Sequence, residues 1–327
     1  MKALVRNLSI VGTTAIGIVA CSSGGGGDGR PFTAAPTGKL SLSITDAPVD
    51  TVDEIVLHFT GVRLKPQDGP EIEVPLVDAN GARITHVIDI LNLTNATYAD
   101  LFVDAEVPAG VYNWIQLEVL ADPMTDGDSH VISNGARYEL RIPSSEQNGL
   151  RLVSPFTVTA DGETHLLIDW DMRMALIRPP GLGGTYMLRP AFRVIDMTEH
   201  GFLTGSVQAE LIDAAGCPGD TMLGTGNAIY VYDAAALEGM DGTELEPGDI
   251  GSTTDPEPIA TGAVALDSSG TYSFRIILSP GEYRAAYTCD GEVDDVETDD
   301  EIFLMLAPET VVIEDGETVS ISFPPAP

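Results

Sequence analysis

The chain has 327 residues, of which 50 are acidic and 16 are basic, so its formal net charge at pH 7 is −34. This charge excludes nucleic acid as a partner, because a phosphate backbone is bound by Lys and Arg, and it argues against docking on anionic lipid head groups. Hydrophobic residues make up 43% of the chain. That share is enough to form a core, and the length corresponds to about two domains.

Residues 1–20 have the pattern of an export signal. Lys2 and Arg6 precede an apolar run from Leu8 to Ala20. A helix of about 13 residues spans roughly 20 Å, which is less than the ~30 Å hydrocarbon core of a membrane. The run therefore predicts a cleaved signal peptide and not a membrane-spanning anchor.

Cys21 follows the apolar run directly, and Ile18-Val-Ala-Cys21 resembles the lipobox of bacterial lipoproteins. The resemblance implies that the Cys21 thiol receives a diacylglyceryl group, with palmitate among its acyl chains, and that cleavage makes Cys21 the first residue. Ser22, where Asp could stand, resembles the pattern of lipoproteins passed on to the outer membrane. The alternative is an ordinary secretory signal in which Cys21 has no such role.

Residues 21–37 are predicted to be a lipidated tether. Gly, Ser and Pro dominate the segment after Cys21, so it cannot bury enough apolar area to fold. Such a segment would hold a folded body away from the membrane. Two or three acyl chains on Cys21 would make the attachment stable.

Residues 38–197 are predicted to form a first β domain, because apolar and polar residues alternate there. Leu40, Leu42 and Ile44 are an example, and similar runs lie at 55–59, 115–119, 138–142 and 188–194. The phase of the alternation changes after Gly61, which predicts a β-bulge. Helical patterns are limited to residues 87–93 and 98–103. Short strands at regular spacing predict a sandwich or a barrel.

Residues 202–327 are predicted to form a second β domain, with alternating runs such as Gly205–Leu211 and Val319–Phe323. The charge changes at the boundary, since residues 201–327 hold 25 acidic but only 2 basic side chains. The sequence thus predicts an all-β chain with two tandem β-sandwich domains, Ig-like or prealbumin-like, after the signal peptide and the tether.

Six stretches of the first domain carry a family resemblance. They are Gly38-Lys-Leu-Ser-Leu-Ser-Ile-Thr-Asp-Ala-Pro48, Ile88-Asp-Ile-Leu-Asn-Leu-Thr94, Val107-Pro-Ala-Gly-Val-Tyr112, Ile142-Pro-Ser-Ser-Glu-Gln-Asn-Gly-Leu-Arg-Leu152, Leu167-Ile-Asp-Trp-Asp171 and Tyr186-Met-Leu-Arg-Pro190. In order and spacing these stretches resemble the DUF4382 family of bacterial and archaeal surface lipoproteins. The resemblance covers about half of the chain and implies an all-β, sandwich-like fold, but it carries over no catalytic residue.

The second domain more loosely resembles carboxypeptidase-regulatory or transthyretin-like sandwiches. Gly270-Thr-Tyr-Ser-Phe274 and Leu278-Ser-Pro-Gly-Glu-Tyr283 resemble the hairpin of that class. This resemblance implies no peptidase activity.

No sequence motif for catalysis is present. The five histidines lie far apart, and H-E-x-x-H, G-x-S-x-G and Walker-type glycine motifs are all missing. A triad can still be assembled in space from distant residues. Asp169 and Asp171 lie on one face of a predicted strand, about 7 Å apart. They are either a paired-carboxylate site for a cation or a sugar, or loop-capping groups at a strand end with Trp170 in the core. We favour the second reading.

No cofactor is predicted, and weak Ca²⁺ binding is the one metal interaction that the sequence suggests. Two segments are rich in carboxylates, residues 122–128 and residues 290–301. Neither has the spacing of an EF-hand. Solvated loops are the alternative interpretation, and we assign no metal ligands.

Cys217 and Cys289 are predicted to form a disulfide, because an even pair of cysteines in an exported chain normally oxidises. The bridge would close a loop of about 70 residues and contribute about 3–4 kcal/mol in the loop-entropy model. Two buried free thiols are the alternative.

Together these features predict a lipid-anchored envelope protein with a structural or binding role, whose ligand is a protein, a glycan or a divalent ion. The alternative is a hydrolase of envelope or extracellular polymers that uses carboxylates such as Asp169 and Asp171.

Overall fold

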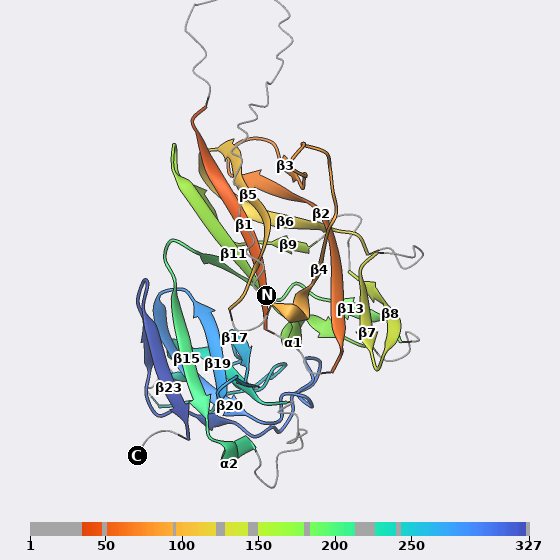
Figure 1. The fold of residues 1–327 in the computed structure, drawn as a ribbon. Coiled ribbons are helices and arrows are strands. Elements are labelled where there is room, and N and C mark those ends of the chain that lie inside the picture. Colours follow the sequence, from red (N-terminus) through yellow and green to blue (C-terminus); the bar gives the residue numbers. More distant parts are fainter. Residues whose placement is uncertain are drawn as a thin grey trace, which may run out of the picture. The chain divides into compact units, whose positions relative to one another are not determined.

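The structure, a computed structural model, describes residues 35–47, 51–93, 96–121, 128–142, 150–179, 184–212, 226–239 and 243–324. Strands dominate these residues (Figure 1), and the protein is all-β, as the alternating sequence pattern predicts. No helix within the described ranges is long and apolar enough to cross a membrane. The chain from Ala35 onward forms one compact unit.

The first half of this unit contains a four-stranded sheet with the strand order β14-β11-β1-β5. Its strands are β1 (Thr37–Ala47), β5 (Ala99–Pro108), β11 (Glu163–Asp171) and β14 (Phe192–Asp196). β1 runs parallel to β11, whereas β5 and β14 pair antiparallel to their neighbours. Because β1 and β11 are parallel, their C-terminal ends lie together at one edge of the sheet.

A second, larger sheet faces the first and follows the order β10-β6-β2-β7-β8-β13-β12, with β3 and β4 paired to β2 and β9 paired to β6. Its strands are β2 (Glu54–Pro66), β3 (Ile72–Pro75), β4 (His86–Asp89), β6 (Gly110–Val119), β7 (His130–Ser133), β8 (Ala136–Arg141), β9 (Leu150–Leu152), β10 (Phe156–Val158), β12 (Leu176–Ile177) and β13 (Tyr186–Leu188). Two short helices accompany the sheets, η1 (Ile90–Asn92) and α1 (Met172–Ala175).

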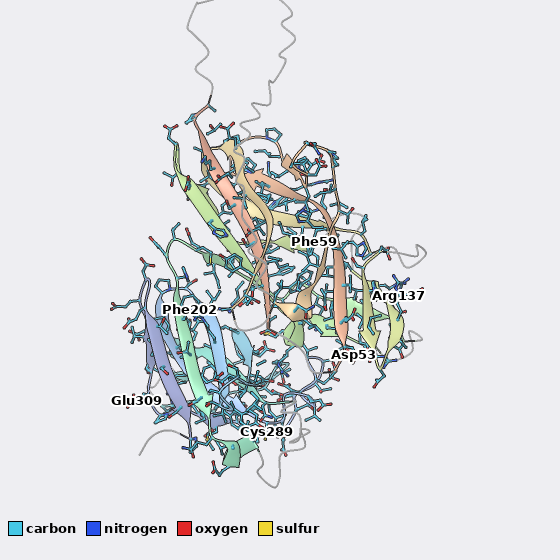
Figure 2. The ribbon with its side chains drawn as sticks, viewed as in Figure 1. Asp53, Phe59, Arg137, Phe202, Cys289 and Glu309 are labelled. Carbon is cyan, nitrogen blue, oxygen red and sulfur yellow. The ribbon has the colours of Figure 1, made fainter. Side chains whose placement is uncertain are left out.

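The two sheets share one apolar core, which makes this half a β-sandwich. Leu42 and Ile168 from the first sheet pack with Phe59 and Ile115 from the second, and all four are fully buried. Phe59 is labelled in Figure 2. The predicted change of phase at Gly61 is confirmed, because the register between β2 and β6 shifts between Phe59 and Gly61. The shift keeps the apolar residues on both sides of Gly61 directed at the core.

Two local predictions are wrong. Residues 87–93 form part of β4 and η1, and residues 98–103 lie mostly in β5, so neither stretch is an α-helix. Residues 188–194 are not one strand either, since β13 belongs to the second sheet and β14 to the first. In both cases the apolar spacing of a short run was compatible with more than one local structure.

The second half is also a sandwich of two sheets. One has the order β18-β19-β15-β23, and the other has the order β17-β16-β20-β21 with β22 paired to β20. The strands are β15 (Gly201–Val207), β16 (Ala228–Asp233), β17 (Ala260–Ala263), β18 (Ala265–Leu266), β19 (Tyr272–Leu278), β20 (Gly281–Thr288), β21 (Met305–Leu306), β22 (Val311–Ile313) and β23 (Thr318–Phe323), and the helices are α2 (Ala209–Ile212) and η2 (Ala234–Leu237).

The core of this half joins both of its sheets, for example Leu203 and Phe274 from one and Val231 and Ala285 from the other. The expected hairpin around Ser279-Pro-Gly281 is wrong in one respect. β19 and β20 follow each other directly, but they lie in opposite sheets. The turn therefore carries the chain across the sandwich.

The two halves pack against each other within the compact unit. Leu167 of β11 and Ile195 of β14 form a small buried cluster with Ile277 of β19. The outer face of the first sheet is thus covered in part by the second half. We refer to this region of contact as the junction. The division of the chain at residues 197 and 202 into two domains stays a proposal.

Candidate functional site

The predicted pair Asp169 and Asp171 lies at the C-terminal end of β11, and both side chains are buried. Trp170 between them is fully buried in the core of the first half. The carboxylate of Asp171 accepts hydrogen bonds from the backbone N–H groups of Arg173 and Met174 and so caps α1. The capping interpretation is therefore confirmed for Asp171, and the core position is confirmed for Trp170.

Asp169 is engaged differently, since its Oδ2 forms an ion pair with the guanidinium of Arg193 on the neighbouring strand β14. The other oxygen of Asp171 reaches the second half, where Oδ2 accepts a hydrogen bond of 2.8 Å from the backbone N–H of Thr261. Both carboxylates of the predicted pair thus hold structural contacts, and one of them links the two halves.

A third carboxylate, Asp46 at the end of β1, joins this group. Its Oδ1 accepts a hydrogen bond of 3.2 Å from the backbone N–H of Met172. Burial raises the pKa of Asp46 well above its usual range, and the charges of Asp171 and Asp169 raise it further. Burial and the Asp169 charge raise the pKa of Asp171 to about 6, against the lowering effect of the Thr261 hydrogen bond.

A small cavity adjoins these carboxylates. It has a volume of about 20 Å³, and its lining includes Thr45, Asp46 and Asp169 from the first half and Thr261 and Arg275 from the second. The carboxylate oxygen Oδ2 of Asp46 and the hydroxyl Oγ1 of Thr261 are buried without a hydrogen-bond partner among the described residues. The junction therefore combines buried charge, unsatisfied polar atoms and space.

The structure also brings together a Ser, a His and an Asp that the sequence did not single out. On the outer face of the first sheet, Ser43 Oγ lies 2.7 Å from Asp100 Oδ1 and 2.7 Å from His165 Nε2. A carboxylate can only accept a hydrogen bond, so Ser43 donates its single proton to Asp100 and His165 must donate to Ser43. This is the reverse of a catalytic triad, in which His takes the serine proton. Ser43 is also fully buried.

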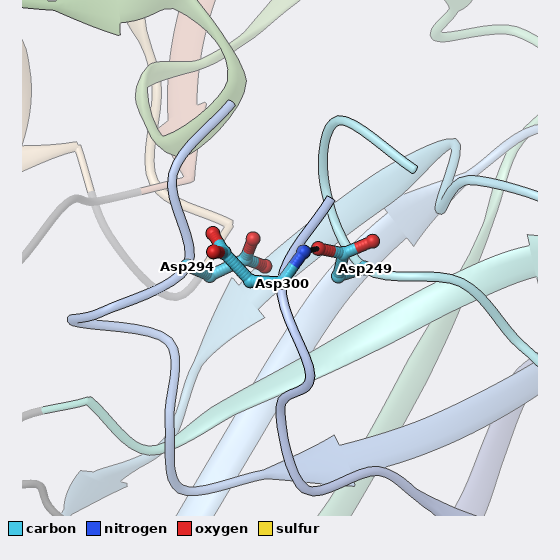
Figure 3. A group of neighbouring side chains, drawn as sticks. All are labelled: Asp249, Asp294 and Asp300. Carbon is cyan, nitrogen blue, oxygen red and sulfur yellow. Dashed lines mark hydrogen bonds between the residues drawn. The ribbon is translucent and has the colours of Figure 1, made fainter. Parts of the chain in front are cut away.

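The acidic segment at residues 290–301 contributes to a second carboxylate group. One oxygen from each of Asp249, Asp294 and Asp300 lies within 4.8 Å of the others (Figure 3). The backbone N–H of Asp300 donates a hydrogen bond to Asp249 (Figure 3). Asp294 Oδ2 accepts hydrogen bonds from the Tyr230 hydroxyl at 2.5 Å and from the Ile250 N–H at 3.2 Å.

Electrostatics in this group disfavour three ionised carboxylates. Burial, together with the charges of Asp249 and Asp300, raises the pKa of Asp294 to about 6. Burial also raises the pKa of Asp249. A hard cation would relieve this repulsion, and carboxylate oxygens are ligands that Ca²⁺ uses. The predicted calcium-like loop thus supplies two of the three carboxylates, while Asp249 comes from a different part of the chain.

Several predicted sites lie outside the described residues. They are the lipid attachment site Cys21, most of the acidic segment 122–128, and Cys217. Cys289, the second cysteine of the predicted disulfide, is buried directly after β20 (Figure 2). The pairing of Cys217 with Cys289 stays a prediction.

Sequence reasoning missed the junction because it depends on pairing that the sequence does not reveal. Asp46 and Asp171 end two strands that are far apart in the chain but parallel neighbours in the sheet. A polar residue at the end of each alternating run was the only signal available. Thr261 and Ser43 gave no signal, since Ser and Thr are common on the outer faces of strands.

Residues 37–190 match the sequence model of DUF4382, described as a domain of unknown function. No curated protein matches the chain at a significant level.

Among solved structures, the chain is similar to the TIE protein of Bacillus anthracis at 12% identity and a TM-score of 0.20, over 88% of this chain and 34% of that one. The chain thus spans about a third of that protein's length. It is also similar to a minor pilin of Streptococcus agalactiae, at 14% identity and a TM-score of 0.16 over 86% and 94% of the two chains.

A third similar structure is a candidate cell adhesion protein of Bacteroides fragilis, at 10% identity and a TM-score of 0.18 over 87% of this chain and 92% of that one. Similarity at these TM-scores says nothing about the function of this chain. The family match is the informative comparison, and it agrees with the resemblance seen in the sequence and with the all-β fold. The DUF4382 model thus matches residues 37–190, and a second β-sandwich follows the matched segment.

Proposed function

We propose that this chain is a non-enzymatic lipoprotein of the bacterial cell envelope, exported, acylated at Cys21 and anchored in the outer membrane. Its two β-sandwich halves would stand on the tether of residues 21–37 and bind a protein or a glycan, or a divalent ion at surface carboxylates. The lipobox-like sequence Ile18-Val-Ala-Cys21 and the Gly-rich segment after it support the anchor.

The observation that carries the binding role is that the candidate catalytic side chains, two Asp and one Ser, are engaged in hydrogen bonds and an ion pair that hold the fold. Asp171 caps α1 and holds the backbone of Thr261, and Asp169 is paired with Arg193. Ser43 is buried, and its hydroxyl donates a hydrogen bond to Asp100. The Asp171–Thr261 contact joins the two halves, and the other two contacts lie within the first half.

The anchor is tested with a Cys21→Ser variant of the full chain. Wild-type protein should incorporate radiolabelled palmitate and fractionate with the outer membrane. The variant should incorporate none and appear in the soluble fraction, because the thiol that receives the diacylglyceryl group is gone. Ser22→Ala is the matched control and should keep the label. An unchanged distribution of the Cys21→Ser protein would rule out the lipid anchor.

A hydrolase of envelope polymers is the second candidate, because Ser43 lies within hydrogen-bond distance of His165 and Asp100, although the hydrogen bonds run opposite to those of a triad. An activated serine reacts with a fluorophosphonate probe. The binding role predicts no labelling of the folded protein. Labelling of wild type that disappears in Ser43→Ala would make the protein a serine hydrolase and would overturn the binding role.

A further inference from the structure

The buried charges at the junction do not balance. Asp46, Asp169 and Asp171 are each at least nine-tenths buried. Two guanidinium groups lie with them, that of Arg173, which is also buried, and that of Arg193, which pairs with Asp169. Among the described residues, three ionised carboxylates and two guanidinium groups leave one negative charge without a countercharge. An uncompensated buried charge is costly.

Arg275 does not supply the missing charge inside the junction. Its side chain is exposed, although it lines the cavity, and its guanidinium lies 3.8 Å from the centre of the Phe202 ring. Solvent screens a cation in this position.

The junction carboxylate without a full set of partners among the residues that the structure describes, that of Asp46, lies at the cavity. Asp46 Oδ2 has no hydrogen-bond partner among the described residues, and Asp46 lines the cavity of about 20 Å³. Thr261 lines the same cavity, and its buried hydroxyl likewise has no partner among these residues. This volume holds about one water-sized particle. Within the described part of the chain, a buried carboxylate oxygen and a buried hydroxyl without hydrogen-bond partners thus belong to residues that line one cavity.

A second hydroxyl at the cavity is oriented as an acceptor. Thr45 Oγ1 donates its proton to the backbone carbonyl of Thr97 at 2.6 Å, or to that of Leu93 at 3.2 Å. A hydroxyl has one proton and two lone pairs, so the lone pairs of Thr45 remain for a positively charged ligand. Carboxylate and hydroxyl oxygens are the ligands of hard cations.

We propose that this cavity binds one monovalent hard cation of the sodium class, with Asp46 and Thr261 as side-chain ligands and Thr45 and Asp169 beside them. One positive charge brings the buried group to neutrality. A divalent ion would give the buried group a net charge of one positive unit, and a water molecule would fill the space but leave one negative charge without a countercharge.

Because the cavity is lined by both halves, an ion bound there would stabilise the contact between them. This inference concerns the junction and is independent of the lipid anchor and of any external ligand. A bound ion stabilises the folded state by mass action.

The test is thermal unfolding of the full chain at pH 8 in sodium chloride and in choline chloride of equal ionic strength. Sodium should raise the Tm of wild type by about 2–6 °C relative to choline, which is too large to enter the cavity. Asp46→Asn should lose this difference, because the amide has no charge to compensate. Glu309→Gln is the matched control, since it removes one charge from an exposed side chain (Figure 2) and should keep the difference.

Equal Tm values in the two salts for wild type would overturn the proposal, and so would an Asp46→Asn protein that keeps the sodium effect. Should Asp46→Asn fail to fold, crystals of wild type soaked in thallium(I) acetate give a direct answer. Anomalous density next to Asp46 Oδ2 supports the site. Its absence there means that a proton, and not a cation, neutralises Asp46, and the proposal fails.

Discussion

Two carboxylates, those of Asp171 and Asp294, stabilise the fold through hydrogen bonds, and each has a different set of partners. Asp171 has two oxygens in two different roles, one capping a short helix and one holding the backbone of Thr261. Asp294 has one oxygen that accepts two hydrogen bonds and another that is buried without a partner among the described residues. A carboxylate that is only half satisfied in a buried place resists ionisation. Such residues make stability depend on pH.

Asp294 lets this dependence be measured. Its pKa of about 6 in the folded state exceeds the 3.8 of a free Asp, so the folded state holds the proton more tightly. Its stabilising contribution is therefore complete below about pH 4 and is lost as the pH rises through 6. Asp294→Asn, which cannot ionise but keeps an oxygen for Tyr230, should be more stable than wild type at pH 8 by on the order of 2 kcal/mol. This gain should disappear near pH 4.

Urea unfolding at pH 4, 6 and 8 measures this effect, with Glu309→Gln as the control for the loss of one exposed charge. A variant that is less stable than wild type at pH 8 would contradict the prediction. If EDTA destabilised wild type at pH 8 by the same amount as the substitution, the ionised Asp294 carboxylate would be a ligand of a bound divalent ion.

At the level of elements, the two halves cross from one sheet to the other in the same way. In the first half, β5 is followed by Ala109 and then β6, and in the second β19 is followed by a turn and then β20. In each, a Tyr two residues after a Gly turns its hydroxyl back to a carbonyl four residues earlier. Tyr112 donates to Pro108 at 2.7 Å, and Tyr283 donates to Ser279 at 2.9 Å.

These two bonds fix the path of the chain at each crossing. Tyr283→Phe should therefore lower the free energy of unfolding by about 1 kcal/mol, and Tyr112→Phe by a similar amount, since each removes a partly buried hydrogen bond. Tyr98→Phe is the control, because Tyr98 is 45% exposed. Chemical denaturation of the three variants checks this expectation. If Tyr98→Phe lowered the free energy of unfolding as much as the other two substitutions, the hydrogen bonds at the crossings would contribute no more to stability than an exposed hydroxyl.

These crossings also show what the sequence can and cannot predict. Alternating residues such as Leu40, Leu42 and Ile44 identified β1 and its buried face, and Gly61 marked a real bulge. Such signals are local, since they depend on side chains within one strand. Sheet membership is not local. The run around Ser279 resembles a hairpin in sequence, but only the packing of the two sheets decides that the strands on either side separate.

The candidate site was less predictable than the fold, for the same reason. Asp169 and Asp171 were found because two carboxylates on one strand are visible in the sequence. Asp46 lies beside them only because β1 runs parallel to β11, and Thr261 comes from the other half. Asp249 reaches Asp294 and Asp300 from another loop. Contacts between distant segments follow from pairing and packing, which a single sequence does not encode in a readable pattern.

On the scale of the whole molecule, basic side chains of the first half contact the strongly acidic second half. Residues 201–327 have 25 acidic and 2 basic side chains, and arginines of the first half reach into this acidic part. Arg173 donates to the carbonyl of Gly291 at 2.8 Å, Arg193 donates to that of Ile277 at 3.3 Å, and Arg189 pairs with Glu297 at 2.8 Å. The Arg189 pair is partly exposed and contributes little, whereas Arg173 is buried and lies next to the carboxylates of the junction.

Arg173 should therefore couple the folding of the two halves. Wild type is expected to unfold in urea in a single transition, whereas Arg173→Met should lower the midpoint, with a cost of about 3–5 kcal/mol, and should separate the unfolding of the first half from that of the second. Fluorescence follows the first half, since Trp114 and Trp170 both lie there, and hydrogen exchange at the Thr261 amide follows the junction. Arg178→Met is the control, because Arg178 is exposed and stacks on Tyr138 and Tyr186 within the first half. Two transitions in wild type would mean that the halves unfold independently and that the buried arginine does not join them.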